Sequence, residues 1–407
     1  MRRNSRLNSR TPTAASRRVG SLLPAIAVAL VAVLGGTALV LDRLWLHTSQ
    51  VELQTAAEAA ALAAGRALAS DDLLRDGFQP EAFLMKARLA AARIALDNSV
   101  AGDPLILNSD ADGDVRFGKL ATDETTGATL FLETSLHPTA VAVHARRTQD
   151  RGAPIWLPIQ SLFSPSNANI VAIAEATLDN RVVGLRPVDD LPLPTFPLAI
   201  LSETWIQTIQ QRRGTDRFAL DLSTGQVTED PDGIPEITLR TPSLADRGVV
   251  ANAFVMTLAG DLTQQELQRQ VRDGWSVADL EPYGGELILD SGPLSLVGAR
   301  GIEAAALAEA LRDVVGQSRV CLLYDRVDGD PRSTTASLRI IGFVAGRVMS
   351  VREVSSDVCE IVFQPAVMTA RSAVVAAEVV GLPGQGAPDE SSSVSPNKYV
   401  YKLRLSN

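Results

Sequence analysis

The pattern of apolar and polar positions separates the first seventy residues from the rest of the chain. An uncharged run of 23 residues extends from Val19 to Leu41, and a helix of that length spans roughly 35 Å, enough to cross the hydrocarbon core of a membrane. A charged, alanine-rich stretch then continues from Asp42 without a helix-breaking residue. The pattern predicts a transmembrane helix over residues 19–41 that continues into an Ala-rich helical stalk over residues 42–98.

Charge gives the predicted span an orientation. The basic segment 1–18 carries six arginines and no acidic residue, and positive charge beside a span favours the cytoplasmic side. We therefore expect a single-pass protein of the inner (cytoplasmic) membrane, with a cytoplasmic N-terminus and an extracytoplasmic body. A cleaved secretory signal is the alternative, although the apolar core of such signals is only about 7–15 residues long. The expected anchor residues are Leu22, Leu30, Val33, Leu34 and the interfacial tryptophan Trp45.

The stretch between Val51 and Leu68 is dominated by alanine, which has high helix propensity and leaves one helix face nearly flat. A second helix is predicted from Pro80 to about Asp97. Small side chains allow close approach of another element. The face packs either on the protein's own next element or on helices of a partner. The residues expected in this packing are Leu53, Ala56, Ala57, Ala60 and Ala64.

From Gly102 onward, short β-type runs separated by Gly, Asp and Pro replace the helical periodicity. The fold class is predicted as α+β, with two mostly antiparallel β-rich extracytoplasmic lobes. The first lobe covers residues 99–186, a Pro-rich linker covers 187–198, and the second lobe covers 199–407 with helical insertions at 262–271 and 302–315. The predicted strands are Leu105–Leu107, Val115–Phe117, Ala128–Leu132, Ala140–Ala145, Ile170–Leu178, Val320–Tyr324, Ser337–Phe343, Arg347–Val354, Cys359–Val362 and Lys398–Leu405, with Ala345-Gly346 as a hinge between the two before Cys359.

Composition narrows the function classes. The net charge is −9, and removal of the six N-terminal arginines takes it to −15, so the body lacks the surplus of Lys and Arg that binds nucleic acid. The two cysteines, Cys321 and Cys359, could form one disulfide contributing about 3–4 kcal/mol. They could equally remain two buried thiols.

The usual catalytic motifs are missing from the sequence, which has no Gly-x-Ser-x-Gly elbow, phosphate-binding loop or His-Glu-x-x-His. We therefore expect no enzyme, no cofactor, no metal and no small-molecule substrate, and a hydrolase with unrecognised acidic catalysts is kept as a further class. Alternate carboxylates in Asp110–Asp114 would suit Ca²⁺. The EF-hand spacing fails, however, because Val115 and Ala121 occupy its sixth and twelfth positions. An Asp-Gly hairpin turn is the favoured interpretation.

Three segments together resemble a known family. They are Asp42-Arg43-Leu44-Trp45, the alanine block Glu52–Ala63 that opens Glu-Leu-Gln-Thr-Ala-Ala, and the alternating segment Thr139–Arg147. This combination resembles the TadG-like (TadE/TadG-like) proteins of the Tad, or Flp, pilus assembly system. The resemblance implies a non-catalytic, membrane-anchored accessory of pilus assembly. Its implied partners are other Tad/Flp pilus assembly proteins and membrane lipid.

Two departures limit what the resemblance implies. Some TadG-like members carry an Asp-x-Ser-x-Ser metal site, but Asp221–Gly225 lacks its second serine, so metal-dependent adhesion is not expected. Gly20 is not followed by a glutamate at the fifth position, so prepilin-type cleavage is not expected either. The alternative function is a membrane-tethered extracytoplasmic module for ligand binding or adhesion.

Overall fold

A computed structural model describes residues 22–122, 129–151, 153–162, 165–245, 250–258, 260, 262–376 and 396–406. The basic segment 1–18, the first residues of the predicted span and Ala128 lie outside the described residues. The chain divides into two compact units. One holds the chain up to Val51 together with Arg147–Ile170, and the other holds Glu52–Arg146 together with the chain from Val171 onward.

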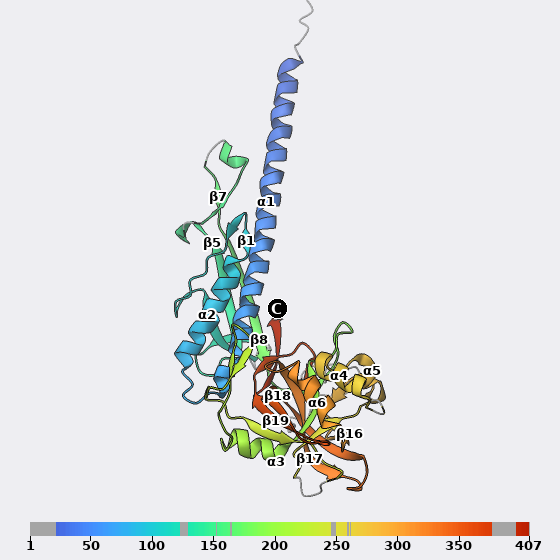
Figure 1. The fold of residues 1–407 in the computed structure, drawn as a ribbon. Helices are drawn as coiled ribbons and strands as arrows, with labels where there is room; N and C mark the ends of the chain where they lie inside the picture. The colour runs from blue at the N-terminus through green and yellow to red at the C-terminus, as the bar shows by residue number, and fades with distance from the viewer. Residues whose placement is uncertain are drawn as a thin grey trace, which may run out of the picture. The chain divides into compact units, whose positions relative to one another are not determined.

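The longest element is the helix α1 (Leu23–Leu68), drawn in blue in Figure 1. Its 46 residues correspond to roughly 69 Å at 1.5 Å per residue, about twice the thickness of a hydrocarbon core. Pro24 lies in the first turn, where its missing N–H breaks no helical hydrogen bond. The apolar run and the alanine-rich stretch therefore form one unbroken helix, followed by a β-rich body that contains both helices and strands.

A short 3₁₀ helix, η1 (Asp71–Leu74), and a turn at Gly77 lead from α1 to α2 (Pro80–Leu96). Pro80 begins α2 as predicted, because its fixed φ suits the first helical position. The buried face of α2 includes Phe83, Ala87, Ala91 and Ala95.

One sheet has the strand order β20-β22-β8-β5-β3-β4. Its strands are β3 (Val115–Thr122), β4 (Thr129–Glu133), β5 (Ala140–Arg147), β8 (Ile170–Asp179), β20 (Met368–Thr369) and β22 (Val400–Ser406). The β22–β8, β3–β4 and β3–β5 pairs are antiparallel, and β20–β22 is parallel. The last strand of the chain thus joins the sheet built mainly by residues 115–179. The predicted strand Leu105–Leu107 is wrong, because this segment has no strand pairing.

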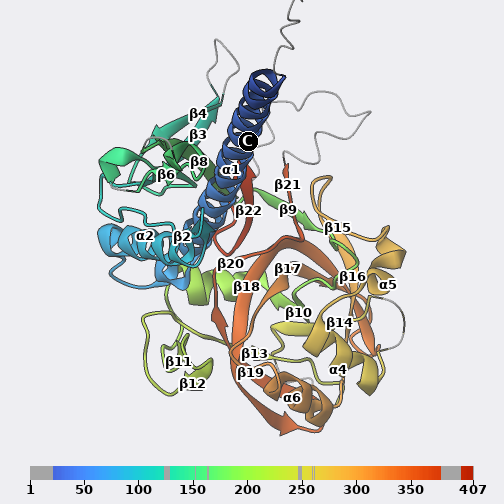
Figure 2. The same cartoon turned by 90° about the horizontal axis from the view of Figure 1, so that it is seen from above.

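The larger sheet has the order β13-β19-β18-β16-β14-β10-β17, and an additional β18–β17 pairing closes five of its strands into a ring. Helices α4 and α6 contact each other beside it (Figure 2), at the places predicted for the two helical insertions. These elements are β10 (Thr195–Leu201), β13 (Ile237–Arg240), β14 (Ala253–Met256), α4 (Gln264–Asp273), β16 (Leu294–Ala299), α6 (Ala304–Arg312), β17 (Ser318–Asp328), β18 (Thr335–Ser355) and β19 (Val358–Pro365).

Two predictions about this sheet are corrected. The strands predicted on either side of Ala345-Gly346 form the single strand β18, without a hinge. A Cβ on Gly346 would lie 2.2 Å from the Phe363 ring, so glycine here allows close approach to β19. The linker predicted over 187–198 is also shorter, because its last residues belong to β10. Pro197 lies inside this strand, at an irregularity of the β10–β17 ladder. Proline is tolerated at such irregularities because no regular ladder hydrogen bond is lost there.

Smaller elements complete the body. Its short helical elements are η2 (Gln149–Arg151), η3 (Gln160–Leu162), α3 (Ser202–Trp205), the π-helical η4 (Ile206–Gln210), α5 (Val277–Leu280) and η5 (Glu281–Tyr283). Its short strands are β1 (Ser99–Val100), β2 (Asp103–Pro104), β6 (Ile155–Trp156), β7 (Asn167–Ala168), β9 (Val182–Leu185), β11 (Ala219–Asp221), β12 (Gln226–Thr228), β15 (Leu287–Ile288) and β21 (Ala373–Val375). The largest fully buried side chains include Trp205, Trp275 and Tyr324, and these belong to the core of the larger sheet.

The disulfide considered for Cys321 and Cys359 is not formed, and both residues are buried free thiols. Cys321 on β17 is paired with Val344 of β18, while Cys359 on β19 is paired with Glu353. The two cysteines thus flank β18 on opposite sides, and neighbouring strands lie about 4.8 Å apart. They are also offset along β18, so the Cα separation exceeds the roughly 4.4–6.8 Å that a disulfide requires.

Candidate functional site

The first section of α1 presents large apolar side chains to its surroundings. Leu22, Leu30, Val33 and Leu34 are all exposed, and Trp45 is 38% exposed. Among the described residues, α1 with its extension to Leu74 is the one helix long and apolar enough to cross a membrane. Exposed apolar side chains in such a continuous run are unfavourable in water but favourable in lipid. This section therefore has the properties of a single N-terminal membrane anchor.

Asp42, the first charged residue after the apolar run, is only 2% exposed. Its two carboxylate oxygens accept hydrogen bonds from the backbone N–H groups of Ile159 and Gln160, at 3.0 and 2.8 Å. Both donors lie where the chain enters η3. A buried carboxylate is costly unless it is hydrogen-bonded, and two backbone donors supply that compensation. The carboxylate therefore fixes residues 159–160 to the helix at the end of the apolar run.

The second section of α1 is buried within the chain itself. The packing residues Leu53, Ala56, Ala57, Ala60 and Ala64 are all buried. A Cβ placed on Gly65 would lie 2.7 Å from Leu403 of β22 and 3.6 Å from Ala176 of β8. The Gln54 amide donates to the carbonyl oxygen of Ile173 in β8. This arrangement corresponds to the self-packing alternative, and it leaves the alanine face covered by the protein's own sheet.

An ion pair ties the end of this helical region to the larger sheet. Arg347 of β18 is 3% exposed and pairs with Asp71, the first residue of η1. The same Asp71 carboxylate accepts the backbone N–H of Val367 at 2.7 Å, while Ser318 provides a second oxygen for Arg347 at 3.2 Å. The sequence did not predict this contact. The two charged residues lie hundreds of positions apart, and each stands in a segment where a charged residue would be expected at the surface.

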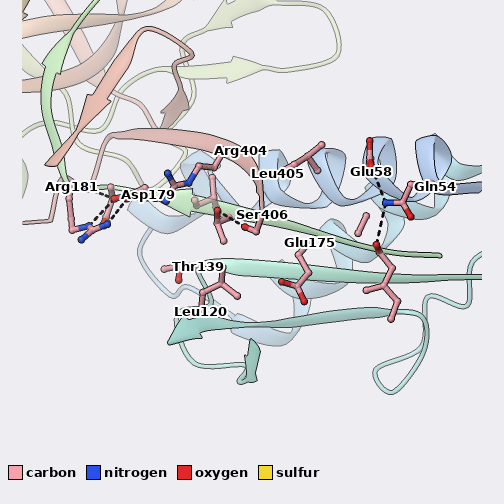
Figure 3. Close-up of a pocket in the computed structure, with 15 residues that line it drawn as sticks. Gln54, Glu58, Leu120, Thr139, Glu175, Asp179, Arg181, Arg404, Leu405 and Ser406 are labelled. Carbon is pink, nitrogen blue, oxygen red and sulfur yellow. Dashed lines mark hydrogen bonds and ion pairs between the residues drawn. The ribbon is translucent and has the colours of Figure 1, made fainter. Parts of the chain in front are cut away.

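A groove of about 1030 Å³ is lined by β8, β22, β3 and α1 residues (Figure 3). Its polar groups bond to one another. Arg181 faces Asp179 at 2.7 Å, Thr177 and Ser406 hydroxyls lie 3.0 Å apart, and Gln54 donates to Glu58. Burial favours a higher pKa for Asp179, but the hydrogen bonds from Arg181 outweigh it and lower the pKa. A general acid needs the opposite shift, so Asp179 is not suited to that role.

A carboxyl group with a raised pKa occurs at Glu236, where burial is the main cause and Asp216 and Asp232 contribute charge repulsion. Its oxygens accept the backbone N–H groups of Arg217 and Phe218 at about 2.9 Å. These bonds hold the loop that precedes β11, and a structural role accounts for the buried carboxyl. The acidic catalysts kept as a further class in the sequence therefore gain no support from this group.

The acidic run Asp110–Asp114 folds as a turn. The Asp114 carboxylate accepts the N–H of Asn108 at 2.8 Å, and the Asn108 amide oxygen accepts the N–H of Asp110. A Cβ on Gly113 would lie 2.3 Å from the Asn108 carbonyl oxygen, so the turn requires glycine. It precedes β3 and is not a hairpin. Within the described part of the chain, no group of three His, Cys, Asp or Glu side chains is placed to hold a metal.

Comparison with known proteins bears on one part of this structure. The Tad family model, described as "Putative Flp pilus-assembly TadE/G-like", matches residues 20–67. The TadE/G-like match confirms the resemblance inferred from Asp42-Arg43-Leu44-Trp45 and the alanine block, while Thr139–Arg147 lies outside the matched residues. It coincides almost completely with α1, and so it includes both the exposed and the buried section of that helix. No curated protein and no solved structure matches the chain.

Proposed function

We propose that this protein is a non-catalytic, membrane-anchored accessory of Tad/Flp pilus assembly that acts through protein–protein contacts. The observation that carries the proposal is the TadE/G-like match at residues 20–67, which falls on the one described helix suited to span a membrane. Residues 1–18 lie in the cytoplasm, residues 19–41 span the inner membrane, and the remainder is extracytoplasmic. The two sheets are two β-rich lobes of this body, connected by the chain that precedes β10 and again by the chain that follows β19.

Partner proteins must use surfaces other than the alanine face, because that face is covered within the chain. Two exposed apolar surfaces are suited to the role. Met85 and Leu89 lie on the outer side of α2, and Leu130 and Leu132 lie on the edge strand β4. Exposed apolar groups favour association with another protein, and an edge strand offers backbone hydrogen-bonding groups as well.

Site-specific photo-crosslinking in intact cells tests the proposal. The photoreactive residue is placed at Leu89 or at Leu132, and the matched control is Leu222 in the exposed β11–β12 turn. We expect crosslinked products with other pilus assembly proteins from Leu89 or Leu132 and far fewer from Leu222, identified by mass spectrometry. The proposal fails if an abundant, folded protein gives no product with any pilus component from these positions in cells that assemble the pilus.

A further inference from the structure

The segment Ala153–Leu162 is bonded to Asp42, where the apolar section of α1 ends, and it contains an exposed tryptophan, Trp156. Trp156 is 58% exposed and lies on β6, which pairs with β7 through Trp156 and Asn167. Its neighbour Ile155 is fully buried, so the strand is fixed on one side and presents the indole on the other. Tryptophan side chains are mostly buried on average, so a tryptophan exposed to this extent is unusual on a surface that only water contacts.

The Asp42 carboxylate fixes the position of this segment along α1. The N–H groups of Ile159 and Gln160 lie within 3.0 Å of its oxygens, and Asp42 directly follows the apolar run. Trp156 is three residues from Ile159, a separation of at most about 10 Å along the chain. The polar interface of a bilayer occupies about 5–7 Å beyond each face of the hydrocarbon core. The segment is therefore held beside the level at which the anchor leaves the membrane.

The helix carries matching side chains at the same level. Leu44 and Trp45 are exposed one turn beyond Leu41, and Trp45 lies where an interfacial aromatic residue is expected. Trp156 brings a second exposed indole to within about 10 Å of chain from the backbone groups that Asp42 holds, from a segment more than a hundred residues away. Indole rings are enriched at membrane interfaces because the ring is apolar while its N–H can bond to water or headgroups.

We propose that the segment Ala153–Leu162 is a second membrane contact, in which Trp156 inserts into the lipid interface while Asp42 holds the segment against α1. The occupant of this surface is the bilayer itself, since Asp42 directly follows the apolar run and fixes the segment to the helix at the end of that run. The proposal rests on the membrane anchor of the proposed function. It adds that a segment outside the anchor helix also contacts the membrane.

Fluorescence quenching by lipids brominated in the upper acyl chain tests the inference on the full chain in vesicles. The protein has four tryptophans, and Trp205 and Trp275 are fully buried in the larger sheet and shielded from lipid. With Trp45 and Trp156 both at the interface, Trp156→Phe is expected to lower the lipid-quenched emission by about half, and Trp45→Phe by a similar amount. Asp42→Ala should release the segment and remove the share that Trp156 contributes.

The outcomes separate this inference from the anchor. If Trp45→Phe lowers the quenched emission and Trp156→Phe does not, the anchor stands and the second contact is overturned, which would favour a protein partner for Trp156. If the unsubstituted protein shows no lipid quenching, the anchor itself fails. If Asp42→Ala leaves the Trp156 share unchanged while the segment stays folded, Asp42 does not hold the segment at the membrane.

Discussion

The two sections of α1 have the same secondary structure but opposite surroundings. In the first, Leu30, Val33 and Leu34 are exposed, whereas in the second, Ala56 and Ala60 are completely buried. Alanine and leucine both favour a helix, so propensity alone does not distinguish the sections. The difference lies in side-chain size. Bulky apolar groups with no protein neighbour suit lipid, and small ones let a helix approach the sheet closely.

The largest effect should come from charging the exposed section. The double variant Leu30→Arg/Val33→Arg is expected to abolish membrane retention, since each arginine near the centre of a span costs about 2.5–3.5 kcal/mol on insertion scales. Fractionation with alkaline extraction measures retention. The matched control is Leu30→Val/Val33→Leu, which exchanges the same side chains and should stay in the membrane. An arginine variant that still fractionates with integral proteins would show that this section is not the anchor.

The next effect should appear where the buried section ends. Asp71→Ala leaves the Arg347 guanidinium buried without its carboxylate, and breaking a buried pair in this way costs about 3–5 kcal/mol. Denaturant unfolding of the purified chain, followed by the emission of buried tryptophans, reports this loss. Asp325→Ala removes a similar but exposed pair with Arg339 and should cost far less. Equal losses from the two variants would contradict the importance of the buried pair.

A smaller effect is expected from enlarging the buried face itself. Ala60→Leu should lower the free energy of unfolding by about 1–3 kcal/mol, because a well-packed contact has no room for the added isopropyl group. Ala63→Leu, at a half-buried position of the same helix, is the control. Alanine and leucine have nearly equal helix propensity, so the difference between the variants measures packing. No difference would mean that the alanine face is loosely packed.

The smallest effect concerns the two cysteines of the larger sheet. Oxidising and reducing buffers should give the same unfolding midpoint, because Cys321 and Cys359 are too far apart to be linked. Burial raises the pKa of the Cys359 thiol to about 12, so it stays protonated and unreactive at pH 8. Intact mass after alkylation without denaturant should therefore show no modified cysteine. A mass two hydrogens lighter under oxidising conditions would indicate a disulfide.

Much of the local structure followed from short-range patterns. The unbroken helix from the apolar run into the alanine stretch, the start of α2 at Pro80 and strands such as β5 and β8 all lie where periodicity placed them. Errors arose where a local signal had a long-range cause. Gly346 suggested a hinge, but its lack of a side chain serves the close passage of β19. Pro197 suggested a linker, but it occupies an irregular position in a strand.

In the candidate site, too, the features of consecutive residues were predictable from the sequence and the contacts between distant segments were not. The exposed apolar residues of α1 and its alanine face could be predicted from the sequence, because hydrophobicity and side-chain size are properties of consecutive residues. The contacts of Asp42 with Ile159 and of Asp71 with Arg347 could not. Asp42 bonds to backbone N–H groups that every segment has, and Asp71 and Arg347 are ordinary charged residues in their own segments, so only the folded chain brings these partners together.

The sequence by itself determined that the protein has an apolar helix long enough for a membrane, an alanine-rich continuation and a β-rich remainder, and it carried the resemblance that the TadE/G-like match confirms. The tertiary structure decided that the alanine face is covered by β8 and β22, that the last strand joins the sheet formed mainly by residues 115–179, and that the cysteines stay apart. The physical reason is that helix and strand formation depend on neighbouring residues, whereas strand order and buried ion pairs depend on which distant surfaces exclude water together.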